Sequence, residues 1–182
     1  TQSLSRVVKQ LPCYAFSRNH EEMAVWLEHQ AELHPDADIT ATDYESYDAG
    51  QSRLTVAIEL MIWRRILNDQ DYISLYNLMY ASRVTPFSSS AGVVYRPEYT
   101  RQSGSAETSL MNTMVSIVVM GVAIVYDSYE CDLKGDNVDY KELARKVNKE
   151  MIANITNRVL AGGDDGIVWG LRNKENMITV SR

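Results

Sequence analysis

Two adjacent aspartates are the residues of this sequence whose type and spacing point most directly to chemistry. Asp164 and Asp165 stand between glycines in the stretch RVLAGGDDGIVWG, which runs from Arg158 to Gly170. Neighbouring carboxylates repel each other and raise each other's pKa unless a cation or strong donors neutralise them. The flanking residues are apolar, so we expect a hairpin whose tip projects from buried strands. Such a tip is either an ordinary solvated turn or a rigid site for Mg²⁺, which takes hard oxygen ligands.

A second acidic pair lies in the stretch TDYESYD, where Asp43 and Asp48 are five residues apart at the junction between an expected strand and a helix. Taken alone, this pair is an acidic helix start, because carboxylates are favoured at helix N-termini. If the strand that ends near Asp43 lies beside the hairpin, Asp43, Asp164 and Asp165 converge at one edge of a sheet. Carboxylates from two elements can hold two divalent ions roughly 3.5–4 Å apart, an arrangement used for in-line phosphoryl transfer.

The third pattern is RQSGSAETSLMNT, residues Arg101 to Thr113, in which a Ser-Gly loop opens a helix. The simplest interpretation makes one of the loop serines an N-cap. Thr108 and Asn112 are spaced i and i+4 and therefore lie on one helix face. The helix is apolar downstream, and a buried amide needs hydrogen-bond partners. This face suits recognition of a sugar hydroxyl, so we expect Asp48, Thr108 and Asn112 where the sugar of a bound nucleotide is read.

These residues must be positioned by a mixture of helices and short strands. Helices are expected over 19–33 (with Asn19 as N-cap), 51–68, 70–82, 106–129 and 140–154. A strand is expected within 37–45, and hairpins over 91–104, with Pro97 in the turn, and 158–170. The helix over 51–68 should turn inward a stripe formed by Leu54, Ile58, Met61, Ile62 and Ile66. The elements alternate without a uniform βαβ rhythm, so the expected fold class is α+β.

Composition bounds the class of protein. The chain has 182 residues, of which 45% are hydrophobic and 23% charged, as in a soluble domain. The formal net charge of −6 by itself argues against a nucleic-acid binder, which needs a basic footprint. Cys13 and Cys131 are far apart and are expected to be reduced thiols of a cytosolic protein. The apolar run 114–126 is too short to span a bilayer and is expected to form a buried helix.

In this order, the stretches TDYESYD, RQSGSAETSLMN and GGDDG resemble the A, B and C motifs of RNA-dependent RNA polymerases from positive-strand RNA viruses. The pattern is most similar to nodavirus-like or tombusvirus-like enzymes, and the resemblance covers about 38–170. It implies an α+β polymerase palm, a small antiparallel sheet backed by helices, with part of the fingers. Residues 1–182 would then be one palm-centred fragment, with 69–102 as a fingers insertion and with the thumb and the remaining fingers missing.

The activity that the resemblance implies is template-directed RNA synthesis in viral genome replication and transcription. A nucleotidyl group would pass from an NTP to an RNA 3′-hydroxyl by a two-metal mechanism, with release of pyrophosphate. The implied cofactors are two Mg²⁺ ions, with Mn²⁺ as a substitute. Asp43 and Asp164 would be metal ligands, and Asp165 would assist them. The isolated fragment is expected to be inactive, because most of the basic template channel would lie in the missing parts.

The resemblance also implies a nucleotide-binding group. Asp48 would sense the ribose 2′-hydroxyl together with Asn112, and Thr108 would support that face. Ser103 and Gly104 would form a mobile loop that adjusts to the template and the incoming nucleotide. Because the 2′-hydroxyl distinguishes RNA precursors from DNA precursors, Asn112 would favour ribonucleotides.

Partners and location follow from the same resemblance. The partners would be template and nascent RNA, NTPs, and the missing fingers and thumb of the same polyprotein or replicase. The implied location is the host cytoplasm, in replication complexes that associate with host membranes through regions outside this chain.

Other classes remain open at this point. A palm-type nucleotide cyclase also carries a GG-acidic-acidic hairpin, but such enzymes have Phe where Gly166 stands here and lack the SGxxxTxxxN helix. Reverse transcriptases commonly place an aromatic residue before the acidic pair, where this chain has Gly163. A non-catalytic structural domain, whose acidic tip only binds cations or solvent, is the third alternative.

Overall fold

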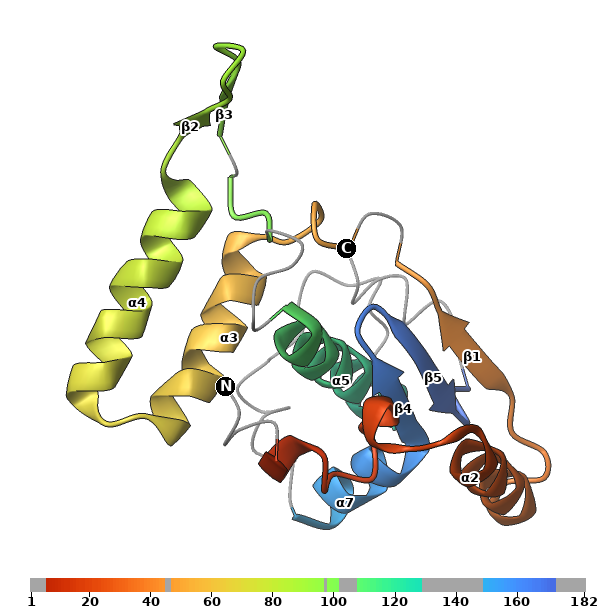
Figure 1. Cartoon of the computed structure of the whole chain (residues 1–182). Coiled ribbons are helices and arrows are strands. Elements are labelled where there is room, and N and C mark those ends of the chain that lie inside the picture. Colours follow the sequence, from red (N-terminus) through yellow and green to blue (C-terminus); the bar gives the residue numbers. More distant parts are fainter. Residues whose placement is uncertain (1–5, 45–46, 97, 102–107, 129–148, 173–182) are drawn as a thin grey trace. The chain divides into compact units, whose positions relative to one another are not determined.

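The computed structural model describes residues 6–44, 47–96, 98–101, 108–128 and 149–172, which form two compact units. The first unit combines Thr1–Asp43 with Asn112–Arg182, and the second comprises Tyr44–Met111. Helices accompany small antiparallel sheets in the chain (Figure 1), so the fold class is α+β, as the sequence indicated. Helix α5 (Thr108–Ser128) begins in the second unit and continues into the first.

The sheet of the first unit joins an early strand to a late hairpin. Its order is β1-β5-β4, with β1 at Ile39–Thr42, β5 at Asp165–Trp169 and β4 at Val159–Gly162. Both pairings are antiparallel. The expected strand and the expected hairpin over 158–170 are therefore both confirmed, and they lie side by side.

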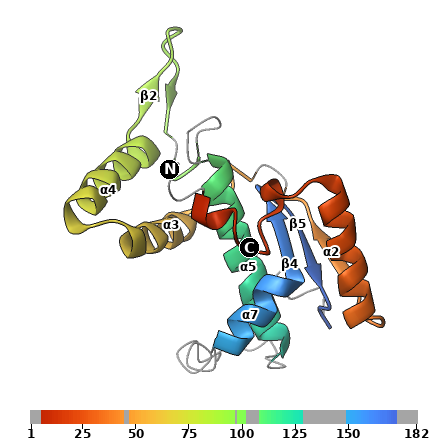
Figure 2. The ribbon, with the colours of Figure 1, turned by 60° about the horizontal axis from the view of Figure 1, so that its bottom comes forward.

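The core of the first unit lies between this sheet and two helices, α5 and α7 (Lys149–Arg158), which Figures 1 and 2 show together on one side of β4. Its buried members come from α5, α7, β4, β5 and the segments around Cys13 and Leu171: Cys13, Met120, Ala123, Ile124, Val125, Ile155, Val159, Ala161, Val168 and Leu171. By length and composition α5 could cross a membrane, yet 61% of its most apolar window is buried inside the protein. It is thus the interior helix expected from the run 114–126. Of the helix expected over 140–154, residues 140–148 lie outside the described residues.

Helix α2 (His20–Leu33) begins as the sequence predicts. The side chain of Asn19 accepts from the backbone N of Glu22 at 2.8 Å, and the carboxylate of Glu22 accepts from the backbone N of Asn19 at 2.8 Å. This reciprocal pair is a capping box, which satisfies two backbone donors that the helix start leaves open. The preceding 3-10 turn, η1, is Ala15–Ser17.

The second unit contains α3 (Arg53–Ile66), α4 (Asp69–Val84) and a small hairpin of β2 (Phe87–Ser88) and β3 (Val94–Tyr95). The prediction that Pro97 forms the hairpin turn is wrong. The turn lies at Gly92, whose φ of 79° favours glycine and whose N donates to the O of Ser89 at 2.9 Å. Pro97 itself lies outside the described residues.

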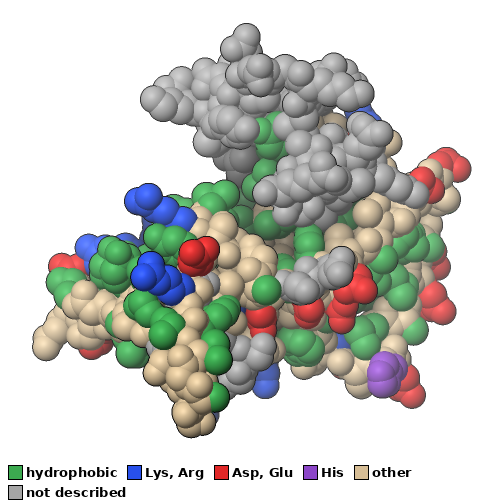
Figure 3. Space-filling model, turned by 90° about the horizontal axis from the view of Figure 1, so that it is seen from above, with side chains coloured by type: hydrophobic (Ala, Val, Ile, Leu, Met, Phe, Trp, Pro, Cys, Tyr) green, Lys and Arg blue, Asp and Glu red, His purple; other side chains and the backbone are tan. Residues whose placement is uncertain are grey.

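The inward face of α3 also differs from the prediction. Val56, Glu59 and Trp63 are buried, whereas Leu54 and Met61 are 69% and 62% exposed. The buried face includes a charged residue, which a rule based on hydrophobic periodicity excludes from the interior. The hydrophobic side chains of Leu54 and Met61 are exposed as a result. More generally, the face of the molecule drawn in Figure 3 shows hydrophobic side chains next to charged ones.

Candidate active site

The paired aspartates stand at a tight two-residue turn. Gly162 pairs with Asp165 at the end of the β4–β5 ladder, so Gly163 and Asp164 are the two central residues of the hairpin turn. Gly163 has a φ of 74°, which suits the glycine that some two-residue hairpin turns require at their first central position. Asp164 and Asp165 are both exposed. Two adjacent carboxylates are thus exposed to solvent at the end of the hairpin, where the two-residue turn defines the backbone conformation.

Asp43 reaches the same end of the sheet from β1. The last pair of the β1–β5 ladder joins Thr42 to Gly166, and Asp43 is the next residue after that pair. Because the strands are antiparallel, the residue after Thr42 lies level with Asp165, the residue before Gly166. Asp43 is exposed as well. The register therefore brings three carboxylates from two elements to one end of a sheet. The strand that ends near Asp43 lies beside the hairpin, which was the condition for this arrangement.

The chemistry of this donor set fits Mg²⁺, because all three side chains offer carboxylate oxygens. Within the described ranges, no three acidic, histidine or cysteine side chains form a ready-made ligand set. Mg²⁺ at phosphoryl-transfer sites is usually bound through one or two carboxylates plus substrate phosphates, without a cage made only of protein groups. Among the described residues, these three carboxylates alone therefore do not make a complete ligand set.

The glycine after the acidic pair is required by close packing. A Cβ on Gly166 would lie 1.8 Å from Cε of Met120 in α5 and 2.9 Å from Oγ1 of Thr42 in β1. Met120 is fully buried, so α5 passes directly over the strand at this point. A larger residue such as Phe does not fit here without rearrangement.

Helix α5 also holds the turn through two hydroxyl groups. The backbone N of Gly163 donates to Oγ1 of Thr113 at 2.8 Å, and Oγ of Ser116 donates to the carbonyl O of Gly163 at 2.8 Å. Both side chains are fully buried. Sequence reasoning missed this pair, although a threonine and a serine at i and i+3 inside an apolar helix were a signal that could have found it.

The nucleotide-binding residues predicted on α5 occupy its first turns. Thr108 is half-buried at the start of the helix, and Asn112 is buried with 6% exposure. Their i and i+4 spacing keeps them on one face, as expected. Asn112 directly precedes Thr113, which binds the aspartate turn. Ser103 and Gly104 lie outside the described residues.

Asp48 lies in the second unit beside the residue that begins the Ser-Gly stretch. Its backbone O accepts from the backbone N of Arg101 at 2.8 Å. Arg101 stands two positions before Ser103 in the sequence. The backbone bond therefore joins the end of the TDYESYD stretch to the start of the RQSG stretch, two segments that sequence alone does not connect.

A buried charged cluster supports this junction. The carboxylate of Glu59 in α3 pairs with Arg83 of α4 at 3.4 Å and also with Arg101. Arg83 additionally donates to the carbonyl O of Tyr99 at 3.2 Å. Glu59 is fully buried, and the guanidinium groups are almost completely so. Removing one partner from such a group leaves uncompensated buried charge, so the cluster fixes Arg101 firmly.

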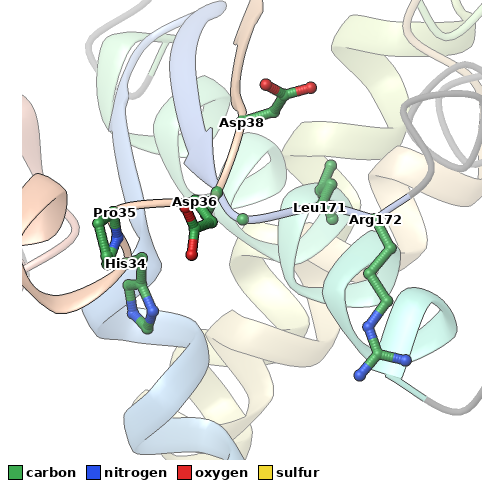
Figure 4. A pocket seen from close by; sticks show the side chains of 8 residues that line it. His34, Pro35, Asp36, Asp38, Leu171 and Arg172 are labelled. Atoms are coloured by element: carbon green, nitrogen blue, oxygen red, sulfur yellow. The ribbon is translucent and has the colours of Figure 1, made fainter.

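A pocket of about 470 Å³ lies at the opposite end of the three-stranded sheet (Figure 4). It is formed by the turn before β1, His34–Asp38, and by Gly170–Arg172 after β5. At this end of the sheet the side chain of Arg158 binds the backbone at the end of β5, where its Nε donates to the O of Trp169 at 2.8 Å. Burial lowers the pKa of Arg158 from its ordinary value. None of the predicted site residues lines this pocket, so it does not belong to the acidic end of the sheet.

Comparison with known proteins addresses the family directly. A family model described as RNA dependent RNA polymerase matches residues 2–136, most of the chain. The matched residues include the first two motifs and end before the GGDDG hairpin. The RNA-directed RNA polymerase of Pieris rapae virus is 30% identical over 115 residues, which cover 61% of this chain and 11% of that relative.

The match favours a polymerase over the nucleotide cyclase that the hairpin alone left open. The placement nearest to nodavirus or tombusvirus enzymes stays a prediction. Three motifs in order, the α+β architecture and a family match over most of the chain agree. The chain belongs to the RNA-dependent RNA polymerases of positive-strand RNA viruses.

Proposed function

We propose that this chain carries the catalytic centre of a polymerase that copies an RNA template by a two-metal mechanism. The observation that carries the proposal is the register of β1 against β5, which brings Asp43 to the end of the sheet where Asp164 and Asp165 stand. In the reaction the 3′-hydroxyl oxygen of the nascent RNA forms a bond to the α-phosphorus of an NTP. The bond from that phosphorus to the β-phosphate bridging oxygen breaks, and pyrophosphate leaves.

The carboxylates of Asp43 and Asp164 would hold two Mg²⁺ ions, or Mn²⁺ in their place, and Asp165 would assist. Bound there, the ions would lower the pKa of the attacking hydroxyl and stabilise the leaving pyrophosphate. The protein's own contribution would be to keep the carboxylates at one end of a sheet. There α5 binds the hairpin turn through Thr113 and Ser116 and packs Met120 against Gly166. Such preorganisation on rigid elements is what holds a catalytic site in productive geometry.

Selection of ribonucleotides would come from the second group of residues. Asp48 and Asn112 would contact the ribose 2′-hydroxyl, with Thr108 supporting Asn112 and the Ser103–Gly104 loop adjusting to the nucleotide. The burial of Asn112 supports this role, because a buried amide recognises a hydroxyl more strictly than a solvated one.

The rest of the enzyme would lie outside this chain, which spans 11% of the length of the Pieris rapae virus polymerase. We assign residues 69–102 to a fingers insertion, with the remaining fingers and the thumb supplied by the same replicase. In this assignment the missing parts would cover exposed apolar residues of the segment, among them Leu78 and Tyr80 of α4 and Val94 of β3. Template RNA, nascent RNA and NTPs would be its partners, in membrane-associated complexes of the host cytoplasm.

The decisive experiment is primer extension by the complete polymerase on an RNA template with Mg²⁺ or Mn²⁺. Asp164→Ala should reduce ribonucleotide incorporation on the order of a thousandfold, since a metal ligand supplies several kcal/mol of transition-state stabilisation. Asp36→Ala is the matched control, because Asp36 is an exposed carboxylate at the other end of the sheet. Incorporation that survives Asp164→Ala would overturn the proposal.

A second assay tests the sugar-reading role. Asn112→Ala should lower the ratio of kcat/KM for ribonucleotides over deoxyribonucleotides by roughly tenfold, because a hydrogen bond to the 2′-hydroxyl is lost. Incorporation of deoxyribonucleotides should change little. An unchanged ratio would remove Asn112 from the sugar-binding group.

A further inference from the structure

The turn that carries Asp164 has little freedom of its own within the fold. Gly163 is buried, and its N–H and C=O must find partners because unpaired buried backbone groups are costly. Both partners come from α5: Thr113 accepts from the N–H, and Ser116 donates to the C=O. Residues on one face of α5 thus bind both the N–H and the C=O group of Gly163.

These hydroxyls differ from an ordinary helical serine. Ser128, near the end of the same helix, donates to the carbonyl O of Ile124 at 2.8 Å, four residues earlier, which is the usual local bond. The hydroxyls of Thr113 and Ser116 reach Gly163, 50 and 47 residues away in sequence. They are fully buried in a helix whose other interior residues are mostly apolar.

The turn is bounded on another side as well. A Cβ on Gly162 would lie 3.3 Å from Cβ of Ala15, and one on Gly163 would lie 3.7 Å from Cζ of Phe16, both residues of η1. η1 therefore lies beside the turn, and the side-chain hydrogen bonds to Gly163 come from the α5 hydroxyls. Because Asp164 follows Gly163 directly, whatever fixes Gly163 also fixes the Cα of Asp164.

We propose that Thr113 and Ser116 are positioning residues: their hydroxyls hold the Gly163–Asp164 turn and thereby aim the Asp164 carboxylate for metal-dependent nucleotidyl transfer. The inference rests on the proposed function, because it assigns these hydroxyls a role in that reaction beyond folding. It also links the two halves of the site. Asn112, which would read the sugar, and Thr113, which holds the metal-binding turn, are consecutive residues of one helix.

The first test measures the turn itself, in the complete polymerase without metal. Thr113→Val keeps the shape of the side chain but removes the acceptor for the Gly163 N–H. Hydrogen exchange at the amide of Gly163 should accelerate roughly tenfold or more, since a buried donor loses its partner. Thr113→Ser should restore the wild-type rate. Ser128→Ala, which removes a hydroxyl from the same helix without touching the turn, should leave the rate unchanged.

The second test measures the consequence for the reaction. In primer extension, Thr113→Val and Ser116→Ala should raise the Mg²⁺ concentration for half-maximal rate several-fold and lower kcat about tenfold, with little change in KM for the NTP. Ser128→Ala should match the wild type. Ser116→Ala removes a single oxygen atom and carries the test if Thr113→Val does not accumulate as folded protein.

The outcomes separate the two proposals. If the wild type shows no extension that depends on Asp164, the proposed function fails whatever the hydroxyls do. If the wild type extends and both variants keep its Mg²⁺ curve and kcat, the positioning role is overturned, even where their thermal stability falls. If the Gly163 amide exchanges at the wild-type rate in Thr113→Val, the hydroxyl does not hold the turn.

Discussion

Replacing Gly166 by alanine tests the close packing of α5 on the β4–β5 hairpin. Gly166 lies in the middle strand, paired with Thr42 on one side and Ala161 on the other. The added Cβ would lie 1.8 Å from Cε of Met120 and 2.9 Å from Oγ1 of Thr42. Carbon atoms in favourable contact are roughly 3.5–4.0 Å apart, so the methyl end of Met120 must move by about 2 Å.

The expected cost follows from two opposing terms. Met120 is fully buried, so its displacement overpacks the core at a cost of about 1–3 kcal/mol. Alanine has less conformational freedom than glycine in the unfolded chain, which returns about 0.5–1 kcal/mol. The net destabilisation of the β4–β5 hairpin should therefore lie within about 0–2.5 kcal/mol.

The assay is hydrogen exchange of the backbone amides of β4 and β5 in the complete polymerase, which reports the local free energy of opening. Gly166→Ala should raise exchange in both strands. Met120→Val shortens the obstructing side chain, so the double variant should be more stable than the sum of the single effects by about 0.5–3 kcal/mol. An unchanged exchange rate in Gly166→Ala, or strictly additive effects in the double variant, would refute the packing argument.

The further predictions concern two buried ionisable groups. Glu59→Gln should destabilise the second unit by about 3–5 kcal/mol, because the buried charges of Arg83 and Arg101 then lose the carboxylate that pairs with them. Chemical denaturation measures this loss, with Glu28→Gln at an exposed position as the control, and equal effects of the two variants would contradict the prediction. Burial raises the pKa of the Cys13 thiol above its ordinary value of 9.0, so alkylation by iodoacetamide at pH 8 should be at least about tenfold slower in the folded than in the unfolded protein. Because the raised pKa belongs to the folded state, stability should fall as pH rises above 9.0, and Cys13→Ala should lessen that fall in thermal unfolding measured across pH.

The elements that position the acidic residues were predictable because their signals are local. The capping residue Asn19 starts α2, and a Gly-rich turn between apolar segments defines the β4–β5 hairpin. The adjacency of Asp43 to that hairpin was stated only as a condition, since strand pairing over more than a hundred residues leaves no local trace. The structure supplies this adjacency through the β1–β5 register.

What escaped prediction depends on contacts between distant polar groups. The predicted inward face of α3 was wrong because hydrophobic periodicity cannot place a glutamate inside. Ion pairs with Arg83 and Arg101 compensate the cost of burying the Glu59 carboxylate. Arg101 was recognised as part of a motif and not as a buried partner. Thr113 and Ser116 were overlooked for a similar reason, because a hydroxyl shows its function only when the atom it contacts is known.

Asn112, proposed to contact the sugar, and Thr113 and Ser116, which bind the turn, lie on one helix, so their spacing in sequence sets the angles between their side chains. Each residue of an α-helix advances the direction of its side chain by about 100°, so inserting or deleting one residue between Asn112 and Ser116 would turn one group away while the other stayed in place. A single substitution along this segment alters one contact, whereas a change of length alters the direction of every side chain beyond it. Among related polymerases, the number of residues between the positions of Asn112 and Ser116 should therefore vary less than the identities of the apolar residues around them.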